Sequence, residues 1–326
     1  MELLNGFEHS SIEKAVYLLR KGDVVAFPTE TVYGLGADAA NSYAVAKIFE
    51  IKKRPKFDPL IVHISDRDWV FRIAKSVPPE AIRLMDHFWP GPLTLILEKK
   101  DVIPEIVTAG LTTVAVRMPS HPVAIDLIKS FDAPIAAPSA NPFGYMSPTK
   151  AQHVATLLDE RVPLILDGGD SACTFGLEST IVSFRDGKVY VHRYGAVSLE
   201  ELTEITGLIH EKEATGLCES PGQLPYHYAP AKPLRIIDSV NDIVNKRSSF
   251  LAFKTPDSTP GSKYGKVLSP TGDLREAATN FFSYLIELDR EDVDIIYAER
   301  VPERGLGKAM MERLKKASKK YRYITH

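Results

Sequence analysis

A proline-rich stretch, residues 219–233, sets the first limit on how this 326-residue chain can fold. It contains four prolines, at positions 221, 225, 230 and 233, and it shows no apolar periodicity. Because proline fixes its own φ and lacks a backbone N–H, the stretch is unsuited to a central strand or a helix interior. The sequence therefore predicts two domains, residues 1–206 and 233–326, joined by a semi-extended linker, residues 207–232.

Both predicted domains alternate short apolar runs with amphipathic segments, which is typical of α/β folds. In the first we expect strands at 24–28, 60–64, 93–97, 114–117, 135–137 and 164–166, and helices at 10–22, 42–53, 67–75, 79–88, 122–130, 149–159 and 198–207. In the second we expect strands at 234–237, 250–253, 266–268 and 295–297, and helices at 239–246, 273–289 and 306–320. Ser10-x-x-Glu13 and Ser198-x-x-Glu201 are capping boxes that predict where two helices begin, and Asp186-Gly187 predicts a hairpin over 180–193.

The composition is close to that of an average soluble globular protein. Charged residues make up 25% of the chain and the formal net charge is −2, so no global field favours nucleic acid or a membrane surface. The two cysteines, Cys173 and Cys218, are too few for a disulfide framework or a four-thiolate zinc site. No apolar run approaches the length of a membrane span, and residues 1–10 lack a basic residue, so we expect a cytoplasmic protein.

Several common catalytic motifs are absent from the sequence. It contains no P-loop, no G-x-S-x-G, no H-E-x-x-H and no C-x-x-C, and its nine histidines have no ligand spacing, so we expect no dedicated metal site. Gly34-Leu-Gly36-Ala-Asp-Ala39 matches a relaxed dinucleotide fingerprint, but it lies in a predicted polar loop over 29–41. Because these glycines do not lie at a tight strand–helix turn, we expect no nicotinamide or flavin site.

Polar clusters follow or precede several of the predicted strands, where ligands usually bind in an α/β sheet. They are residues 28–31, 52–55, 117–119, 138–141 and 178–180, with Arg193 at the end of the hairpin. Three arginines, one lysine and several hydroxyls at one crevice suit an anionic substrate that carries phosphates. Each cluster alone is also typical of a solvated loop. Composition and spacing alone therefore predict only an α/β protein that binds phosphates.

Taken together, seven motifs in fixed order resemble one family, the L-threonylcarbamoyladenylate synthases with a YrdC-like domain. The motifs are Pro28-Thr-Glu-Thr-Val-Tyr-Gly-Leu35, Lys52-x-Arg54-Pro-x-x-x-Pro-Leu60 with His63, Val116-Arg-Met-Pro119, Ala137-Pro-Ser-Ala-Asn141, Ser147-Pro-Thr149, Glu178-Ser-Thr-Ile-Val182 and Val191-His-Arg-Tyr-Gly195. The linker residues 220–230 resemble the family's long form, which has an extra C-terminal domain. The resemblance covers nearly the whole chain.

This resemblance implies a fold and a reaction. The fold would be an open, twisted, mixed sheet with helices, followed by a smaller Rossmann-like α/β domain. L-Threonine, bicarbonate (or CO2) and ATP would give threonylcarbamoyl-AMP and diphosphate. The product would pass to partner proteins that modify tRNA, and Mg2+ would arrive with ATP. The enzyme would thus be a nucleotidyltransferase.

The resemblance also implies roles for individual residues. Catalysis would rest on fixed cations, Lys52 and Arg54, rather than on a covalent nucleophile. L-Threonine would be held by Thr31, His63, Arg117, Ala137 and Ser179. ATP would be held by Lys52, Arg54, Asp58, Thr113, Ser139, Asn141, Ser147, Arg193 and Tyr228. Tyr226 and Tyr228, between Pro225 and Pro230, suggest that the linker closes as a lid over the nucleotide.

Simpler interpretations stay open for some of these residues. Lys52 and Arg54 are also placed to cap a helix C-terminus, and His63 to be a structural histidine at a strand end. Residues 303–326 carry eight Lys or Arg and two Asp or Glu, including Arg313, Lys316, Lys319 and Lys320. This basic tail is either the solvated face of a terminal helix or a contact with tRNA or an acidic partner.

Three other functions compete with the synthase. A double-stranded RNA-binding module without catalysis would use a concave basic sheet face, but the chain has no interleaved aromatic and basic stretch and its net charge is negative. Carbamoyl transfer for metal-centre assembly would bring cysteine-rich zinc modules, which two cysteines cannot form. A structural scaffold leaves the polar clusters at the strand ends unexplained.

Overall fold

The computed structural model describes residues 1–211, 220–221, 227–243, 247–256, 261–262 and 264–320. The chain forms two compact units. Unit 1 comprises residues 1–143, 148–174 and 178–223, and unit 2 comprises residues 144–147, 175–177 and 224–326. Unit 2 therefore includes two short segments that lie within the first predicted domain. The predicted division into domains at residues 1–206 and 233–326, with a linker between them, stays a prediction.

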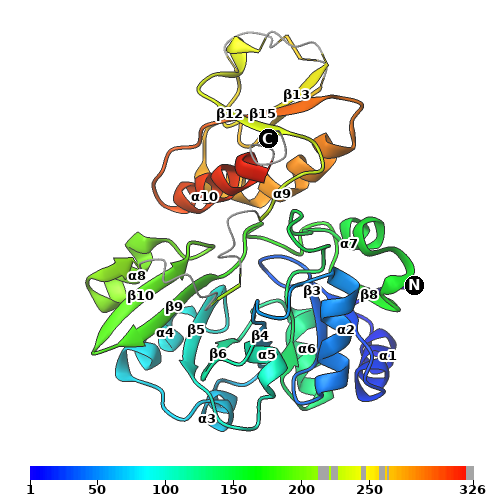
Figure 1. Cartoon of the computed structure of the whole chain (residues 1–326), viewed down its shortest axis with the longest axis vertical. Helices are drawn as coiled ribbons and strands as arrows, with labels where there is room; N and C mark the ends of the chain where they lie inside the picture. The colour runs from blue at the N-terminus through cyan, green and yellow to red at the C-terminus, as the bar shows by residue number, and fades with distance from the viewer. Residues whose placement is uncertain (212–219, 222–226, 244–246, 257–260, 263, 321–326) are drawn as a thin grey trace. The chain divides into compact units, whose positions relative to one another are not determined.

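Unit 1 is built on a mixed sheet of 11 strands in the order β1-β8-β2-β3-β7-β4-β6-β5-β9-β10-β11, shown with its helices in Figure 1. Its strands are β1 (Glu2–Asn5), β2 (Val25–Phe27), β3 (Gly34–Asp38), β4 (Ile61–His63), β5 (Leu93–Glu98), β6 (Thr113–Arg117), β7 (Ile135–Ala136), β8 (Leu164–Asp167), β9 (Thr180–Arg185), β10 (Lys188–Arg193) and β11 (Ile209–Glu211). Its helices are α1 (His9–Arg20), α2 (Ser42–Lys52), η1 (Arg67–Trp69), α3 (Val70–Ile73), α4 (Pro79–Phe88), α5 (Glu105–Thr108), α6 (Pro122–Phe131), α7 (Ala151–Leu158), η2 (Asp159–Arg161) and α8 (Leu199–Thr206). This is the mixed α/β architecture expected from the sequence.

The largest departure from the predicted elements is β3, which forms where a polar loop was expected. It pairs antiparallel with both β2 and β7. A Cβ atom at Gly36 would lie 2.6 Å from Cε1 of Phe27, so glycine is needed for the strands to pack this closely. Gly34 and Gly36 are therefore strand residues of the sheet, which agrees with the expectation that they form no dinucleotide-binding turn.

Two predicted helix features differ from the structure. The capping box at Ser10 is wrong, because α1 begins at His9 and its N-cap, Glu8, makes no side-chain cap hydrogen bond. The capping box at Ser198 is confirmed, with reciprocal bonds between Ser198 and Glu201. The helix expected at 239–246 is also wrong over the described residues, since only the 3-10 turn η3 (Val240–Asp242) forms there.

The two faces of the unit 1 sheet bury different side chains. Because residues alternate between faces along a strand, Val62, Val116 and Val182 point into the main hydrophobic core. Their neighbours on the opposite face form a separate apolar cluster of Ile61, Ile96, Ala115 and Ile181. His63 and Arg117 lie two residues beyond Ile61 and Ala115 and therefore share the second face. This face positions the candidate site.

Unit 2 contains a four-stranded parallel sheet with two long helices. The strands β12 (Leu234–Ile237), β15 (Ile295–Glu299), β13 (Ser248–Ala252) and β14 (Tyr264–Val267) lie in this order. The helices α9 (Leu274–Arg290) and α10 (Leu306–Lys319) lie beside each other against the sheet (Figure 1). Parallel strands with crossover helices are typical of a Rossmann-like arrangement, as expected.

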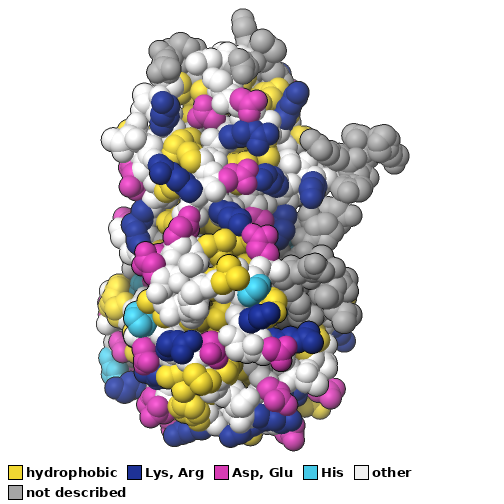
Figure 2. Space-filling model, turned by 90° about the vertical axis from the view of Figure 1, so that its left-hand side faces the viewer, with side chains coloured by type: hydrophobic (Ala, Val, Ile, Leu, Met, Phe, Trp, Pro, Cys, Tyr) yellow, Lys and Arg dark blue, Asp and Glu magenta, His cyan; other side chains and the backbone are white. Residues whose placement is uncertain are grey.

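The cationic surface expected on α10 is only partly present. Arg313 was expected in solvent but is 1% exposed, and its Nη1 donates to the carbonyl of Ala309, 3.1 Å away. Lys316 pairs with Glu312 at 2.6 Å. Figure 2 shows Lys and Arg side chains interspersed with Asp and Glu side chains on the face that it presents. Within the described residues, no helix is both long and apolar enough to span a membrane.

Candidate active site

The register of β4, β6 and β5 brings distant residues onto one face of the sheet. His63 at the end of β4 pairs with Arg117 at the end of β6. Thr113 begins β6, and alternation places it on the same face as Arg117. Arg117 lies four positions after Thr113 along the strand, which corresponds to about 13 Å. The two ends of β6 can therefore hold two different groups of a substrate, or two substrates.

Arg117 is the centre of a buried hydrogen-bond network. Its Nε donates to the carbonyl of Gly91 (3.2 Å), its Nη1 to Oγ1 of Thr31 (2.9 Å) and its Nη2 to Oε1 of Glu30 (2.6 Å). The other carboxylate oxygen of Glu30 accepts the backbone N–H of Ser120 at 3.1 Å. A guanidinium has five N–H groups, so two of those of Arg117 have no partner among the described residues. They are available to bind a carboxylate.

His63 lies beside Arg117 as an uncharged imidazole. It is 4% exposed, and its Nδ1 lies 3.2 Å from the carbonyl oxygen of Ile61. Burial, and secondly the nearby Arg117 charge, lower the pKa of His63 from 6.5 to about 3. At neutral pH His63 can therefore form hydrogen bonds with a ligand but adds no charge to the site.

Ser179 and Arg193 meet at the same end of the sheet. Arg193 donates from Nε to the Ser179 carbonyl and from Nη2 to the Ser179 hydroxyl, both at 3.0 Å. A register shift between Val191 and Arg193 interrupts the ladder with β9, and such irregularities redirect side chains. The hydroxyl of Ser179 also lies 2.7 Å from that of Thr94, which is fully buried on β5.

Lys52 orients the loop after β7 rather than capping its own helix. It is the last residue of α2 and is 1% exposed. Its Nζ donates to the carbonyls of Ser139 (2.5 Å) and Asn141, which lie in a different segment of the chain. Burial, and secondly the charge of Arg54, lower the pKa of Lys52 well below its usual value. Burial therefore disfavours the ammonium form of Lys52 in the empty site, and a phosphate bound beside it would favour that form.

Arg54 and Asp58 form a buried ion pair. Nη2 of Arg54 lies 2.9 Å from Oδ1 of Asp58, and the two side chains are 3% and 0% exposed. Arg54 also donates to the carbonyls of Asp58 (3.1 Å) and Pro59 (2.9 Å). Asp58 therefore fixes the guanidinium of Arg54, and its contact with ATP stays a prediction.

The remaining expected site residues divide between the two units. Ala137 in unit 1 already donates its N–H to the carbonyl of Ile61 at 2.9 Å, and Asn141 is 1% exposed. Ser147 and Tyr228 belong to unit 2. There the ring of Tyr228 lies 5.0 Å from the guanidinium carbon of Arg313. Tyr226, the second tyrosine of the expected lid, lies outside the described residues.

Sequence reasoning did not single out Glu30 and Thr94. Glu30 lies inside the motif Pro28–Leu35, yet its partner Arg117 is 87 residues away, and Thr94 is 85 residues from Ser179. A buried strand residue such as Thr94 carries no local polar signal. For Glu30 the available signal was an acidic residue flanked by two threonines at a strand end.

A metal would have few protein ligands in this site. Among the described residues there is no group of three or more His, Cys, Asp or Glu side chains that could hold an ion. In the described part of the chain, the carboxylate beside Lys52 and Arg54 is that of Asp58, and it pairs with Arg54. This donor set fits Mg2+ only if the substrate supplies most of the oxygens.

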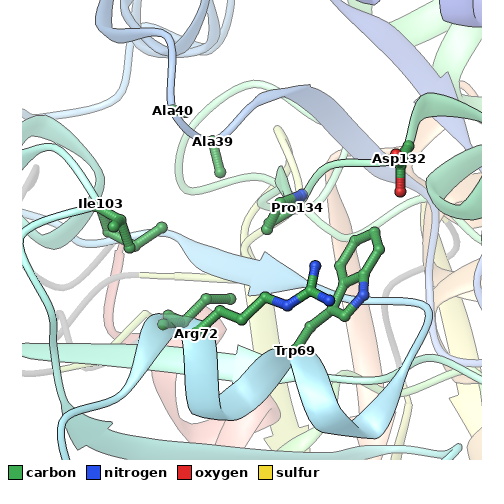
Figure 3. Close-up of a pocket in the computed structure, with 9 residues that line it drawn as sticks. Ala39, Ala40, Trp69, Arg72, Ile103, Asp132 and Pro134 are labelled. Carbon is green, nitrogen blue, oxygen red and sulfur yellow. The ribbon is translucent and has the colours of Figure 1, made fainter.

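A separate pocket of about 200 Å³ contains none of the expected site residues. Its lining includes Ala39, Trp69, Ile73, Ile103 and Pro134, which are apolar. Figure 3 shows Trp69 and Arg72 projecting from neighbouring helical turns into this pocket, with Asp132 at its border. The guanidinium of Arg72 lies over the ring of Trp69 at 5.8 Å.

The chain is similar to known proteins over both units. A family profile described as "Telomere recombination" (Sua5/YciO/YrdC) matches residues 17–195, and one described as "Threonylcarbamoyl-AMP synthase, C-terminal domain" matches residues 197–319. The chain is 42% identical to the threonylcarbamoyl-AMP synthase of Pyrococcus abyssi, with 95% of both chains covered. It is also 42% identical to that of Bacillus subtilis, with 94% of this chain and 92% of that protein covered. The crystal structure of P. abyssi Sua5 complexed with L-threonine matches with a TM-score of 0.91 at 38% identity, covering 98% of each chain.

Proposed function

The chain belongs to the Sua5/YciO/YrdC family of threonylcarbamoyl-AMP synthases, and from this membership we propose that it makes threonylcarbamoyl-AMP from L-threonine, ATP and bicarbonate or CO2. The observation that carries the proposal is a buried site with two unlike groups of polar side chains. One end offers the two N–H groups of Arg117 that have no partner among the described residues, beside the uncharged His63. Lys52 and Arg54, two buried cations, supply positive charge for phosphates.

The Arg117 end suits the carboxylate and hydroxyl of an amino acid. A guanidinium binds a carboxylate through two parallel hydrogen bonds, and Arg117 has two N–H groups left for it. Thr31 and His63 supply neutral polar groups for the threonine hydroxyl and amine. Ser179, fixed by Thr94 and Arg193, adds a further hydroxyl. Ala137 would add a backbone contact, for which its carbonyl remains because its N–H is already donated.

The chemistry is a nucleotidyl transfer between two anions. The neutral threonine amine first adds to CO2 and loses a proton, or replaces the hydroxyl of bicarbonate with release of water, to give a carbamate. A carbamate oxygen then attacks the α-phosphorus of ATP, and the bond between the α-phosphorus and the oxygen that bridges to the β-phosphorus breaks to release diphosphate. Lys52 and Arg54 lower the repulsion between the carbamate and the phosphates. Thr113, Ser139, Asn141 and Arg193 provide further contacts for ATP. Mg2+, carried in by the triphosphate, would neutralise part of its charge.

Wider roles follow from the same proposal. The product would be consumed by proteins that transfer the threonylcarbamoyl group to tRNA. Three expectations stay predictions. The basic tail would contact tRNA, the linker with Tyr228 would close over ATP alongside Ser147, and the protein would be cytoplasmic. The names of the relatives favour catalysis over a double-stranded RNA-binding module, and the burial of the site cations agrees, because such a module needs them at the surface.

The test is diphosphate release from Mg-ATP with L-threonine and bicarbonate, each omitted in turn, with L-serine as a control amino acid. We expect release only with the complete mixture and a carbamoyl-adenylate of the expected mass. Lys52→Met should reduce release strongly because it removes the buried cation while keeping an apolar side chain of similar length. Lys14→Met, at an exposed ion pair with Glu2, is the matched control and should leave the rate unchanged. Release without threonine, or an RNA complex with no release, would overturn the proposal.

A further inference from the structure

Arg117 and Glu30 form a buried ion pair whose two charges cancel, and the next cation among the described residues of this end of the sheet is Arg193, which is held by Ser179. Glu30 is the ion-pair partner of Arg117, and the two side chains are 5% and 4% exposed. Three other ionisable side chains lie close enough to be affected by this pair: His63, His121 and Cys173. Burial is the main cause in each case. It lowers the pKa of both histidines and raises that of the thiol, so all three are uncharged at neutral pH.

We infer that Glu30 is a specificity-determining residue, which cancels the charge of Arg117 so that the pocket accepts a zwitterionic amino acid and rejects simple anions. The inference rests on the proposed function, in which Arg117 binds the threonine carboxylate. Because the Arg117–Glu30 pair has no net charge, a zwitterion that binds beside it adds no net buried charge. An anion without an ammonium group would leave one uncompensated negative charge in a buried site, which is costly.

The geometry gives Glu30 a second effect on the same residue. Its two carboxylate oxygens bind different groups, Oε1 the Nη2 of Arg117 and Oε2 the backbone N–H of Ser120. Glu30 thereby ties the guanidinium plane to the start of the segment that leads into α6. With Thr31 and Gly91 as the other acceptors, each nitrogen of the guanidinium makes one hydrogen bond, so the plane of the group is fixed.

The charge balance also separates the two substrates. The triphosphate of ATP is strongly anionic, so a pocket with the full charge of Arg117 would attract its phosphates as well as the amino acid. Cancelling that charge with Glu30 removes this attraction. Occupation of the amino-acid pocket by phosphate or diphosphate is therefore disfavoured.

Glu30→Gln tests the inference, because it removes the charge and nearly preserves the shape. Acetate, which has a carboxylate but no ammonium group, is the probe, and its affinity is measured by calorimetry or by competition with L-threonine. At an effective dielectric constant near 20 and a separation of a few ångströms, the lost repulsion should tighten acetate binding about tenfold or more. L-Threonine should bind several-fold more weakly. The NH2 group of the introduced glutamine would face the backbone N–H of Ser120, so the hydrogen bond that Glu30 accepts there is lost. Inorganic diphosphate should become a competitor of acetate.

Two variants separate charge from shape. Glu30→Asp keeps the charge and shortens the side chain, so acetate binding should stay weak. Arg117→Gln leaves Glu30 as the only charged member of the pair, so the pocket should prefer ethylamine to acetate. This variant keeps the inference testable if Glu30→Gln does not fold.

If acetate binding is unchanged or weakened in Glu30→Gln, the inference is wrong. Failure of the wild-type protein to bind L-threonine would instead refute the proposed function, since the acetate comparison does not depend on threonine.

Discussion

The uncharged state of His63 makes a quantitative prediction about stability in acid. The pKa of His63 is about 3 in the folded protein and 6.5 in an unfolded chain. As the pH falls below 6.5 the unfolded chain takes up a proton that the folded protein does not, so the unfolded state is favoured. The stability that neutral His63 provides is thus complete above pH 6.5 and is lost progressively down to about pH 3. pH 5 lies 1.5 units below the unfolded-chain pKa of 6.5, so the free energy of unfolding at pH 5 is lower by about 2 kcal/mol.

The comparison that isolates this effect is between the wild-type protein and His63→Asn. Asparagine cannot titrate, and its amide can still donate to the Ile61 carbonyl. Urea unfolding at pH 7 and pH 5 can be followed by tryptophan fluorescence, because both tryptophans, Trp69 and Trp89, belong to unit 1. We expect the wild-type protein to lose about 2 kcal/mol more than the variant between the two pH values, whatever other groups titrate in both.

Equal losses of free energy in the two proteins would refute the reasoning. They would mean that His63 takes up a proton as readily in the folded protein as in the unfolded chain, so that it would carry charge in the site. A second readout separates the outcomes, since direct titration of the His63 ring by NMR should show no protonation of the folded protein at pH 5.

Two further predictions concern single contacts of the sheet. Thr94→Val removes the hydroxyl that bonds Ser179, so L-threonine should bind about three- to tenfold more weakly, or about 1 kcal/mol. Calorimetry measures this affinity, and an unchanged value would show that Arg193 alone orients Ser179. Gly36→Ala places a Cβ 2.6 Å from Phe27 and should cost about 1–3 kcal/mol in urea unfolding. Gly34→Ala is its control, with no contact closer than 3.4 Å, and equal losses in both would contradict the packing argument.

Much of the fold follows from local pattern in the sequence. Elements with strong apolar periodicity, such as α4 and the hairpin of β9 and β10, begin and end where they were predicted. Elements that depend on distant partners were missed. β1 is exposed along most of its length and forms because β8 pairs with it, and β3 is rich in glycine and forms because Phe27 and Ile135 fill the space above it. Neither strand carries the alternation that marks a strand by itself.

The candidate site shows the same division. The resemblance supplied residues that would contact substrates, and the structure brings Thr31, His63 and Arg117 together on one face. What sequence could not supply were the residues that hold these in place. Glu30 and Thr94 act through a partner more than 80 residues away, and no local spacing encodes such a pair.

Two short segments from the first half of the chain belong to unit 2, and this has an evolutionary consequence. Residues 144–147 and 175–177 make their contacts there: Tyr145 donates to Asp289, Gly144 accepts the N–H of Ala229, and Phe175 lies 4.8 Å from the guanidinium of Arg275. A descendant that lost the chain after residue 223 would leave these two segments without those partners. Gene truncation should therefore be followed by compensating substitutions at both segments, so that relatives of the short and the long form diverge there in concert.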